Sequence, residues 1–318
     1  MLYLNERDIK RSVSLKDVME GVEKAFHIYK DKNFFMPDRI HIDKEPNTLL
    51  YMPCFTKDIF GTKIISLFPE NTHKNLPVID GLVLLNNIET GKPVGMLNGA
   101  YLTAYRTGAV GGVGVKYVTP EDVTSLGLIG TGVQGFYQVL FACEARDFKK
   151  VTVYNRTKEK VEGFIARLKK ELPNMEIVSA DTTEELVKNS EVIITATSSN
   201  EPVLPDDEEL LKGKHIVGIG SYKPDMHEFP KSLYGLIDNI YIDNDFACEE
   251  SGDLITPLNE GWIEKEQVKL FTELMDRKVE KGETTLFKSV GMALFDMVVS
   301  QIIYEKAKEK NIGQKIEL

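Results

Sequence analysis

Apolar and polar residues follow two different patterns along this chain. After Ser14, apolar residues recur at helical spacing, which predicts a helix from about residue 15 that ends near 31–33. Strand-like runs then follow at 36–42, 48–52, 61–68, 78–86 and 93–97, with no helical pattern between them. Strands in direct succession predict an antiparallel meander or a partial barrel rather than a parallel sheet.

Residues 102–117 are unusually rich in small side chains, which predicts a helix packed closely against another element. The pattern then changes. Apolar strands are predicted at 126–129, 151–154, 176–178, 191–197, 214–219 and 237–242, and helices at 136–145, 158–172 and 183–189. Strands that alternate with helices predict a parallel sheet, and a further helical pattern is read from Thr285 to the charged C-terminal end.

These patterns predict an α/β protein of two domains. Residues 1–118 form an N-terminal α+β domain, and the C-terminal helical segment, residues 296–318, packs back on it. Residues 119–295 form a Rossmann dinucleotide-binding domain.

The strongest motif is Gly130-x-Gly132-x-x-Gly135, between an apolar strand and a helix. In a dinucleotide fold, the first glycine permits a tight turn, the second lets the backbone approach a pyrophosphate, and the third allows close packing of helix and strand. The helix N-terminus then offers free N–H groups to the phosphates. The motif with this context predicts NAD(P) binding.

Asn155 stands about 20 residues after the motif, where a carboxylate would bind the 2′-hydroxyl of NAD. Asn155 removes a charge that repels a 2′-phosphate, and the Arg156 guanidinium is suited to binding one. The pair favours NADP as cofactor, with NAD as the alternative. The alternative interpretation is that Asn155 only ends a strand and Arg156 is a solvated surface charge.

Composition and charge argue against several kinds of partner and site. The 318 residues carry a formal net charge of −10, which argues against nucleic acid and anionic membranes as partners. No apolar stretch is long enough to span a membrane, and the N-terminus lacks a signal-peptide pattern, so a cytoplasmic protein is expected. The three cysteines and five histidines show no ligand spacing, so no metal site is predicted.

Three basic residues are candidates for substrate chemistry: Arg39, Lys63 and Arg106. Lys63 lies in an apolar strand, where burial lowers the pKa of a lysine and lets it hold a carboxylate or exchange protons. Arg106 lies among small residues. A long guanidinium side chain in such a segment is expected to face an anion. The alternative for each is an ordinary surface or snorkelling side chain.

Several segments taken in order resemble the ornithine cyclodeaminase/μ-crystallin family. They are M-P-D-R (36–39), G-T-K-I-I (61–65), T-A-Y-R-T-G-A (103–109), G-T-G-V-Q (130–134), T-S-S-N-E-P-V-L (197–204), G-S-Y-K-P-D-M-H-E (220–228) and F-K-S-V-G (287–291). The resemblance implies a homodimer in which the N-terminal domain, residues 1–118 with 296–318 packed on it, binds substrate and carries the interface sheet. It also implies that an active site lies between the two domains.

The resemblance further implies roles for individual residues. Arg39, Lys63 and Arg106 match the family's groups for the substrate carboxylate and amine, and Val290 and Gly291 match its nicotinamide and substrate wall. Besides the three glycines, the residues that match its cofactor contacts are Arg106, Thr107, Val133, Gln134, Asn155, Arg156, Thr157, Thr197 and Ser289.

One departure from the family pattern bears on the reaction. Cyclodeaminases of this family have a catalytic aspartate two residues before the proline that matches Pro224, and this chain has Tyr222 there. Asp225 resembles the Pro-Asp of the reductase-like members and is a second catalytic candidate beside Lys63, or else a turn former.

The resemblance thus favours an NAD(P)-dependent oxidoreductase of a small amino or imino acid. The alternatives are ornithine cyclodeamination with an internally recycled cofactor, and a non-catalytic cofactor-binding protein.

Overall fold

The computed structural model describes residues 1–74 and 76–317, and its chain divides into two compact units. The terminal unit comprises Met1–Arg106 and Met292–Leu318, and the central unit comprises Thr107–Gly291. Helix α3 (Gly99–Val118) crosses the division, with its first eight residues in the terminal unit.

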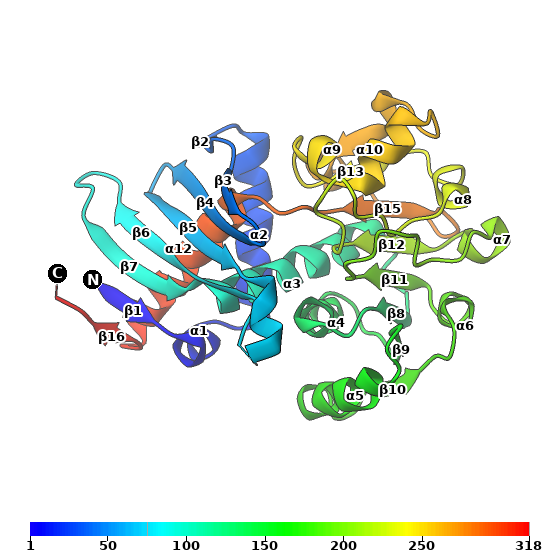
Figure 1. Ribbon diagram of the computed structural model, residues 1–318, viewed down its shortest axis with the longest axis horizontal. Coiled ribbons are helices and arrows are strands. Elements are labelled where there is room, and N and C mark those ends of the chain that lie inside the picture. The colour runs from blue at the N-terminus through cyan, green and yellow to red at the C-terminus, as the bar shows by residue number, and fades with distance from the viewer. Residues whose placement is uncertain (75, 318) are drawn as a thin grey trace. The chain divides into compact units, whose positions relative to one another are not determined.

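The terminal unit contains a mixed sheet in the order β16-β1-β7-β6-β5-β4-β2, with β3 also paired to β4 (Figure 1). Strands β3 to β7 form the predicted antiparallel meander. The strands of this sheet are β1 (Leu2–Leu4), β2 (Phe34–Phe35), β3 (Ile40–Lys44), β4 (Asn47–Thr56), β5 (Ile59–Leu67), β6 (Ile79–Asn87), β7 (Pro93–Asn98) and β16 (Gln314–Lys315).

Helices α2 (Leu15–Lys30) and α12 (Ala293–Glu309) pack against each other, and α12 lies on β4, β5 and β6. Phe26 meets Phe295 edge-on at 5.0 Å between ring centroids, and Lys306 pairs with Asp17 at 2.8 Å. Helix α1 (Glu6–Ser12) also contacts α12, and a 3₁₀ turn spans Pro69–Lys74. The last long helix is therefore part of the terminal unit.

Alternate residues of β5 face the helices, as the period of a strand requires. Ile59, Gly61, Lys63 and Ile65 are buried, and the residues between them are half-exposed. Across the sheet Lys63 pairs with Met52 on β4 and with Val83 on β6, both buried. This register places the Lys63 side chain on the buried face.

The central unit is built on a sheet in the order β10-β9-β8-β11-β12-β15-β13-β14, and every pair in it is parallel. Its strands are β8 (Ser125–Ile129), β9 (Lys150–Tyr154), β10 (Glu176–Ser179), β11 (Val192–Thr195), β12 (His215–Gly218), β13 (Ile240–Ile242), β14 (Val268–Leu270) and β15 (Thr285–Lys288). The order reverses between β8 and β11, which is where ligands bind in open α/β sheets.

The helices of the central unit connect these strands. They are α4 (Val133–Ala145), α5 (Glu159–Glu171), α6 (Thr183–Lys188), α7 (Glu208–Leu211), α8 (Lys231–Tyr234), α9 (Ala247–Glu250), α10 (Gly252–Asn259) and α11 (Phe271–Leu274), with a 3₁₀ turn at Lys265–Gln267. Gly108 and Gly112 of α3 lie against Phe141 of α4, so the small-residue segment is a closely packed helix, as predicted.

One predicted element is wrong. The helical pattern read from Thr285 covers strand β15, and the helix begins only at Ala293. Residues 285–288 are all buried between β12 and β13, a setting in which a strand is apolar on both faces.

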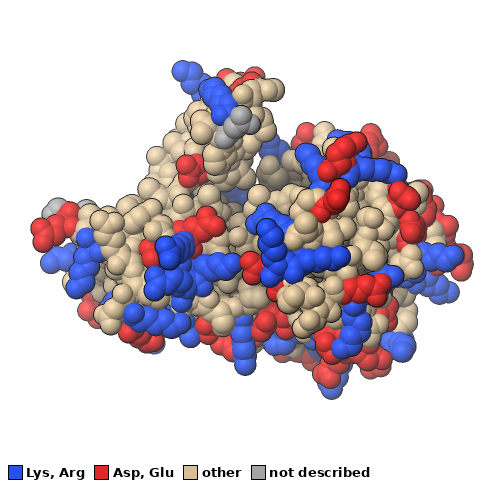
Figure 2. Space-filling view, turned by 90° about the horizontal axis from the view of Figure 1, so that it is seen from below, with Lys and Arg blue, Asp and Glu red and all other residues tan. Residues whose placement is uncertain are grey.

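The surface carries charge of both signs. Figure 2 shows acidic and basic side chains interspersed over the face in view. Among the described residues, no helix is long and apolar enough to cross a membrane.

Candidate active site and nucleotide site

Lys63, Arg106 and Asp296 form a buried charged cluster in the terminal unit. The Lys63 Nζ lies 2.7 Å from Asp296 Oδ2, and the Arg106 Nε donates to Asp296 Oδ1 at 2.8 Å. Strand β5 carries Lys63, α3 carries Arg106, and the first turn of α12 carries Asp296. All three side chains are nearly fully buried, so the alternative of exposed basic residues does not hold for Lys63 and Arg106.

Two cations that share one carboxylate leave one positive charge in excess. Burial lowers the pKa of Lys63 to about 8, although the Asp296 carboxylate works against this change. Burial opposes ionisation of Asp296, but the charges of Arg106 and Lys63 outweigh it and hold the pKa of that carboxyl below its ordinary value. Lys63 can therefore change protonation state near neutral pH while Asp296 stays ionised.

Arg39 lies between β2 and β3 and is half-buried. Its charge also lowers the pKa of Lys63, so it is close enough to add to the positive potential of the cluster. The three basic residues chosen from the sequence thus act on one site. Such a cluster suits a substrate with a carboxylate and a nitrogen that gains or loses a proton.

The glycine motif of the central unit has the geometry of a phosphate-binding turn. Gly130 has φ +106°, where a glycine is favoured, and its N–H donates to the Tyr154 carbonyl at 3.0 Å. A Cβ at Gly135 would overlap the Gly130 carbonyl oxygen, so this position needs a glycine for close packing. At Gly132, by contrast, no described residue other than the glycine's own chain neighbours has an atom within 4 Å of where a Cβ would be.

Polar atoms in this turn fit a dinucleotide. Within residues 1–74 and 76–317, neither the buried Thr131 Oγ1 nor the buried Gln134 Oε1 has a hydrogen-bond partner. A hydroxyl can donate to a phosphate oxygen, and an amide oxygen can accept from a ribose hydroxyl. Together with the open space at Gly132 and the N-terminus of α4, the residues present suit a bound NAD(P).

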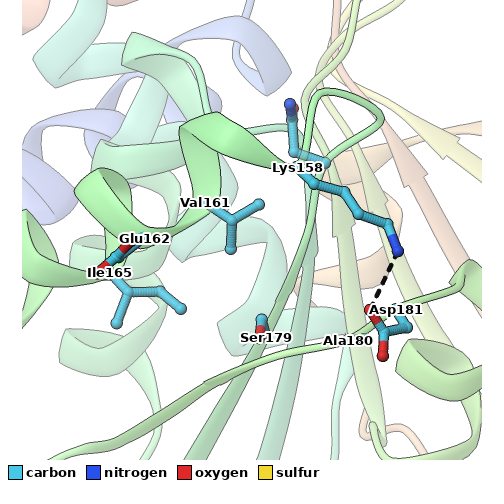
Figure 3. Close-up of a pocket in the computed structure, with 8 residues that line it drawn as sticks. Lys158, Val161, Glu162, Ile165, Ser179, Ala180 and Asp181 are labelled. Atoms are coloured by element: carbon cyan, nitrogen blue, oxygen red, sulfur yellow. Dashed lines mark hydrogen bonds and ion pairs between the residues drawn. The ribbon is translucent and has the colours of Figure 1, made fainter.

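Asn155 follows β9 and links the glycine turn after β8 to the loop after β9. Its Oδ1 accepts from the Thr131 N–H at 3.2 Å, and its Nδ2 donates to the Thr157 carbonyl at 2.9 Å. Asn155 also lines a cavity of about 270 Å³ beside α5, in which Lys158 pairs with Asp181 at 3.1 Å (Figure 3). The other lining residues are Val161, Glu162, Ile165, Ser179 and Ala180.

The remaining cofactor candidates of the central unit follow the carboxyl ends of other strands. Thr197 comes after β11, and Ser289, Val290 and Gly291 come after β15. Asp243, after β13, fixes the latter segment, because it accepts from the Ser289 hydroxyl at 2.6 Å and from the Gly291 N–H at 2.7 Å. Two further cofactor candidates lie elsewhere: Thr107 lies in α3, and Val133 is exposed at the start of α4. The second catalytic candidate, Asp225, is exposed after β12.

Comparison with known proteins agrees with this geometry. The model of the ornithine cyclodeaminase/mu-crystallin family matches residues 2–311. The chain belongs to this family. It is 32% identical, over an alignment of 330 positions, to a Delta(1)-pyrroline-2-carboxylate reductase of Bacillus cereus, with all of both chains covered.

Two solved protein structures are also similar to the structure of this chain. The Thermococcus litoralis Delta(1)-pyrroline-2-carboxylate reductase, in complex with NADH and L-proline, is 33% identical with a TM-score of 0.92, over 99% of this chain and 100% of that one. An archaeal alanine dehydrogenase dimer with bound NAD is 28% identical with a TM-score of 0.91, over 100% and 99%. The predicted family and the α/β Rossmann fold class are confirmed.

Three buried carboxylates of these sites are absent from the candidates named in the sequence: Asp296, Asp243 and Glu228. Asp296 is the single charge within the apolar segment 293–299, and Asp243 directly follows an apolar strand. An isolated carboxylate in such a segment is a usable signal, because an unpaired buried charge is costly. Glu228 has no such local signal, since the groups that donate to it lie in two segments earlier in the chain, at Thr195–Thr197 and at Gly220.

Proposed function

We propose that this family member is an NAD(P)-dependent reductase of small imino acids, which also oxidises the corresponding amino acids. The observation that carries the proposal is the buried Lys63–Asp296–Arg106 cluster, in a chain whose central unit has the features of a dinucleotide-binding fold. The relatives named as pyrroline-2-carboxylate reductase and alanine dehydrogenase support the same reaction class.

In this proposal, Arg106 and Arg39 bind the substrate carboxylate and Lys63 acts on the nitrogen. Reduction of an imine adds a hydride to carbon and a proton to nitrogen, and the bound NAD(P)H supplies the hydride. The Lys63 ammonium donates the proton, and Asp296 holds Lys63 in place and keeps it partly protonated. In the oxidative direction, neutral Lys63 accepts the proton. Asp225 remains the second candidate for an acid–base role.

The substrate class follows from the same groups. A planar cyclic imine with an adjacent carboxylate, such as 1-pyrroline-2-carboxylate, offers one anion to the guanidinium groups and one nitrogen to Lys63. Ornithine cyclodeamination is the second candidate, and Tyr222 argues against it, because the position lacks the carboxylate of the cyclodeaminases.

The decisive assay follows NADPH or NADH absorbance at 340 nm with 1-pyrroline-2-carboxylate, and with pyruvate plus ammonia. Net oxidation of the cofactor is the expected result. Ammonia released from ornithine without a net absorbance change would establish cyclodeamination instead. Neither signal over a panel of imino acids, with cofactor binding intact, would favour the non-catalytic alternative.

We propose NADP as the preferred cofactor. Asn155 presents no charge to a 2′-phosphate, and Arg156 and Lys158 supply two cations near it. Lys158 is already paired with Asp181, so a phosphate competes with that exposed carboxylate. The relatives with bound NADH or NAD support a nicotinamide dinucleotide as cofactor.

Replacing Asn155 with aspartate tests this preference. Wild-type protein is expected to bind NADPH more tightly than NADH. In Asn155→Asp the order reverses by about 1–3 kcal/mol, because a carboxylate repels the 2′-phosphate and accepts from a ribose hydroxyl. Fluorescence titration gives both dissociation constants, and the NADH value controls for loss of the hydrogen bond to Thr157. Equal affinities of the wild type for the two cofactors contradict the preference.

We also propose a homodimer formed through the sheet of the terminal unit. On β3, the side chains of Ile40 and Ile42 are each 52% exposed. Phe35 on β2 and Phe55 on β4 extend this apolar surface. The archaeal alanine dehydrogenase, which is described as a dimer, supports the same assembly.

A further inference from the structure

Glu228 is a fully buried carboxylate that accepts five hydrogen bonds. Its Oε1 accepts from the Thr197 N–H at 2.9 Å and the Thr197 hydroxyl at 2.7 Å. Its Oε2 accepts from the Thr195 hydroxyl at 3.0 Å and from the N–H groups of Gly220 and Ser221 at 2.9 and 3.2 Å. Three of the donors are backbone N–H groups that cannot accept, so the arrangement suits the ionised carboxylate.

These donors belong to two loops at the carboxyl edge of the parallel sheet. Thr195 and Thr197 end β11 and begin its loop, and Gly220 and Ser221 lie in the loop after β12. A Cβ at Gly220 would overlap backbone atoms of Thr197, so the two loops are in direct contact there. Strand β11 adjoins β8, where the strand order reverses, so Glu228 joins loops beside the predicted cofactor position.

A second layer of charges holds Glu228 in turn. Asp253 Oδ1 accepts from the backbone N–H groups of Glu228 and Phe229 at 2.7 and 3.3 Å. Asp253 Oδ2 lies 3.4 Å from the Lys288 Nζ, and all three charged residues are at most 1% exposed. Lys288 ends β15 and directly precedes Ser289, so the network reaches a third loop of the cofactor candidates.

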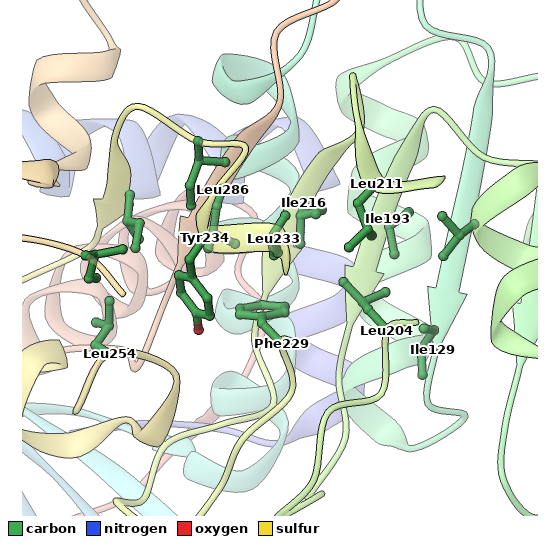
Figure 4. Packing of buried hydrophobic residues seen from close by; sticks show 14 of the residues in the cluster. Ile129, Ile193, Leu204, Leu211, Ile216, Phe229, Leu233, Tyr234, Leu254 and Leu286 are labelled. Atoms are coloured by element: carbon green, nitrogen blue, oxygen red, sulfur yellow. The ribbon is translucent and has the colours of Figure 1, made fainter. Parts of the chain in front are cut away.

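Apolar packing surrounds this network. Phe229 and Leu254, the chain neighbours of Glu228 and Asp253, lie in the buried hydrophobic cluster of the central unit (Figure 4). Burial of an ion pair is rarely the cheapest way to stabilise a fold, because desolvation opposes the gain from pairing. A carboxylate that joins two ligand-facing loops therefore calls for a role beyond stability.

We propose that Glu228 is a positioning residue for the cofactor: its carboxylate holds the loops after β11 and β12 in the shape that receives NAD(P). The proposal rests on the cofactor binding proposed above. It predicts that removal of the negative charge loosens both loops, because an amide at this position would direct its NH₂ group at donors that cannot accept.

Glu191 offers a matched control on the same sheet. It too accepts from two hydroxyls and two backbone N–H groups, those of Thr124 and Ser125. Thr124 precedes β8, Ser125 begins it, and Glu191 precedes β11. The Glu191 carboxylate therefore links two segments at the amino edge of the sheet, opposite to the edge at which Glu228 acts. The two glutamates lie at opposite edges of the sheet, and they also differ in burial, because Glu228 is fully buried and Glu191 is half-buried.

The test compares Glu228→Gln with Glu191→Gln in the full-length protein. Thermal unfolding reports stability, and fluorescence titration reports the dissociation constants of NADH and NADPH. In Glu228→Gln both dissociation constants are expected to rise by about 10-fold or more, and in Glu191→Gln they stay within about 2-fold of wild type. A folded Glu228→Gln protein with wild-type affinities overturns the proposal, as does an equal loss in both variants.

Thr195→Val keeps the test informative if Glu228→Gln does not fold. The variant is close in shape and removes one of the five donors, so the dissociation constants are expected to rise about 3-fold. Unchanged affinities in that variant overturn the proposal. A wild-type protein that binds neither cofactor has a different meaning, because it refutes the cofactor site itself.

Discussion

Replacing Lys63 with alanine lowers turnover of the imino-acid substrate by about 100-fold or more, the range for a lost general acid–base group. Cofactor affinity is expected to stay nearly unchanged, because Lys63 belongs to the terminal unit and the glycine motif to the central unit. Single-turnover kinetics and cofactor titration on the same preparation separate the two effects. An alanine variant with full turnover would remove Lys63 from the mechanism.

Lys63→Arg is the matched control. It keeps the positive charge beside Asp296, but a guanidinium does not release its proton near neutral pH. Turnover is therefore expected to stay low in Lys63→Arg, while a role in charge pairing alone would be rescued. The two substitutions thus separate proton transfer from simple electrostatic support.

The pH dependence of the reaction carries the same information. Because the pKa of Lys63 is lowered to about 8, the ammonium needed for reduction is lost as pH rises through 8. Reductive kcat/KM falls above that pH, and oxidative kcat/KM rises toward it. Asp296→Asn removes the charge that raises this pKa, so both breaks move to lower pH. Profiles that do not move in Asp296→Asn would show that Asp296 does not act through Lys63.

Sequence reasoning worked best where the chemistry is local. The turn Gly130–Gly135 and Asn155 lie in one strand–helix–strand segment, so spacing alone related them. The sequence also limited the side chain of Lys63 to one of the two faces of its strand, because successive residues of a strand point to opposite faces. Choosing the buried face required the packing of α12 on β5, which no local pattern contains.

The sequence alone could not identify the buried residue that pairs with Lys63 and Arg106. Arg106 and Asp296 are 190 residues apart, and the chain offers many acidic residues as alternatives. For a related reason, the helical pattern read from Thr285 did not separate strand β15 from helix α12 near Gly291. The apolar residues on both sides of it fit a buried strand and a buried helix equally well. The break comes from Gly291, which adopts φ +79° between β15 and α12.

Gly132→Val is expected to weaken cofactor binding strongly and to leave the fold intact. Gly132 has φ −78° and ψ −173°, an extended conformation open to any residue, and only its own chain neighbours have atoms within 4 Å of the position that a Cβ would take, among the described residues. The Cβ of the new side chain therefore meets no described residue beyond its chain neighbours, and the side chain occupies space that the pyrophosphate needs. We expect a rise in the NADPH dissociation constant of about 100-fold or more. Loss of glycine at the start of α4 costs only about 1 kcal/mol of stability.

Gly163→Val on α5 is the control for this substitution, since a Cβ at Gly163 likewise has no described atom within 4 Å apart from its chain neighbours and the backbone of its own helix. That variant is expected to bind NADPH as wild type does, so a difference between the two valines reports the ligand and not the added bulk. Calorimetric titration measures binding, and far-ultraviolet circular dichroism with thermal unfolding shows that both variants are folded. A folded Gly132→Val protein that binds NADPH normally would mean that the pyrophosphate does not approach the backbone at this turn.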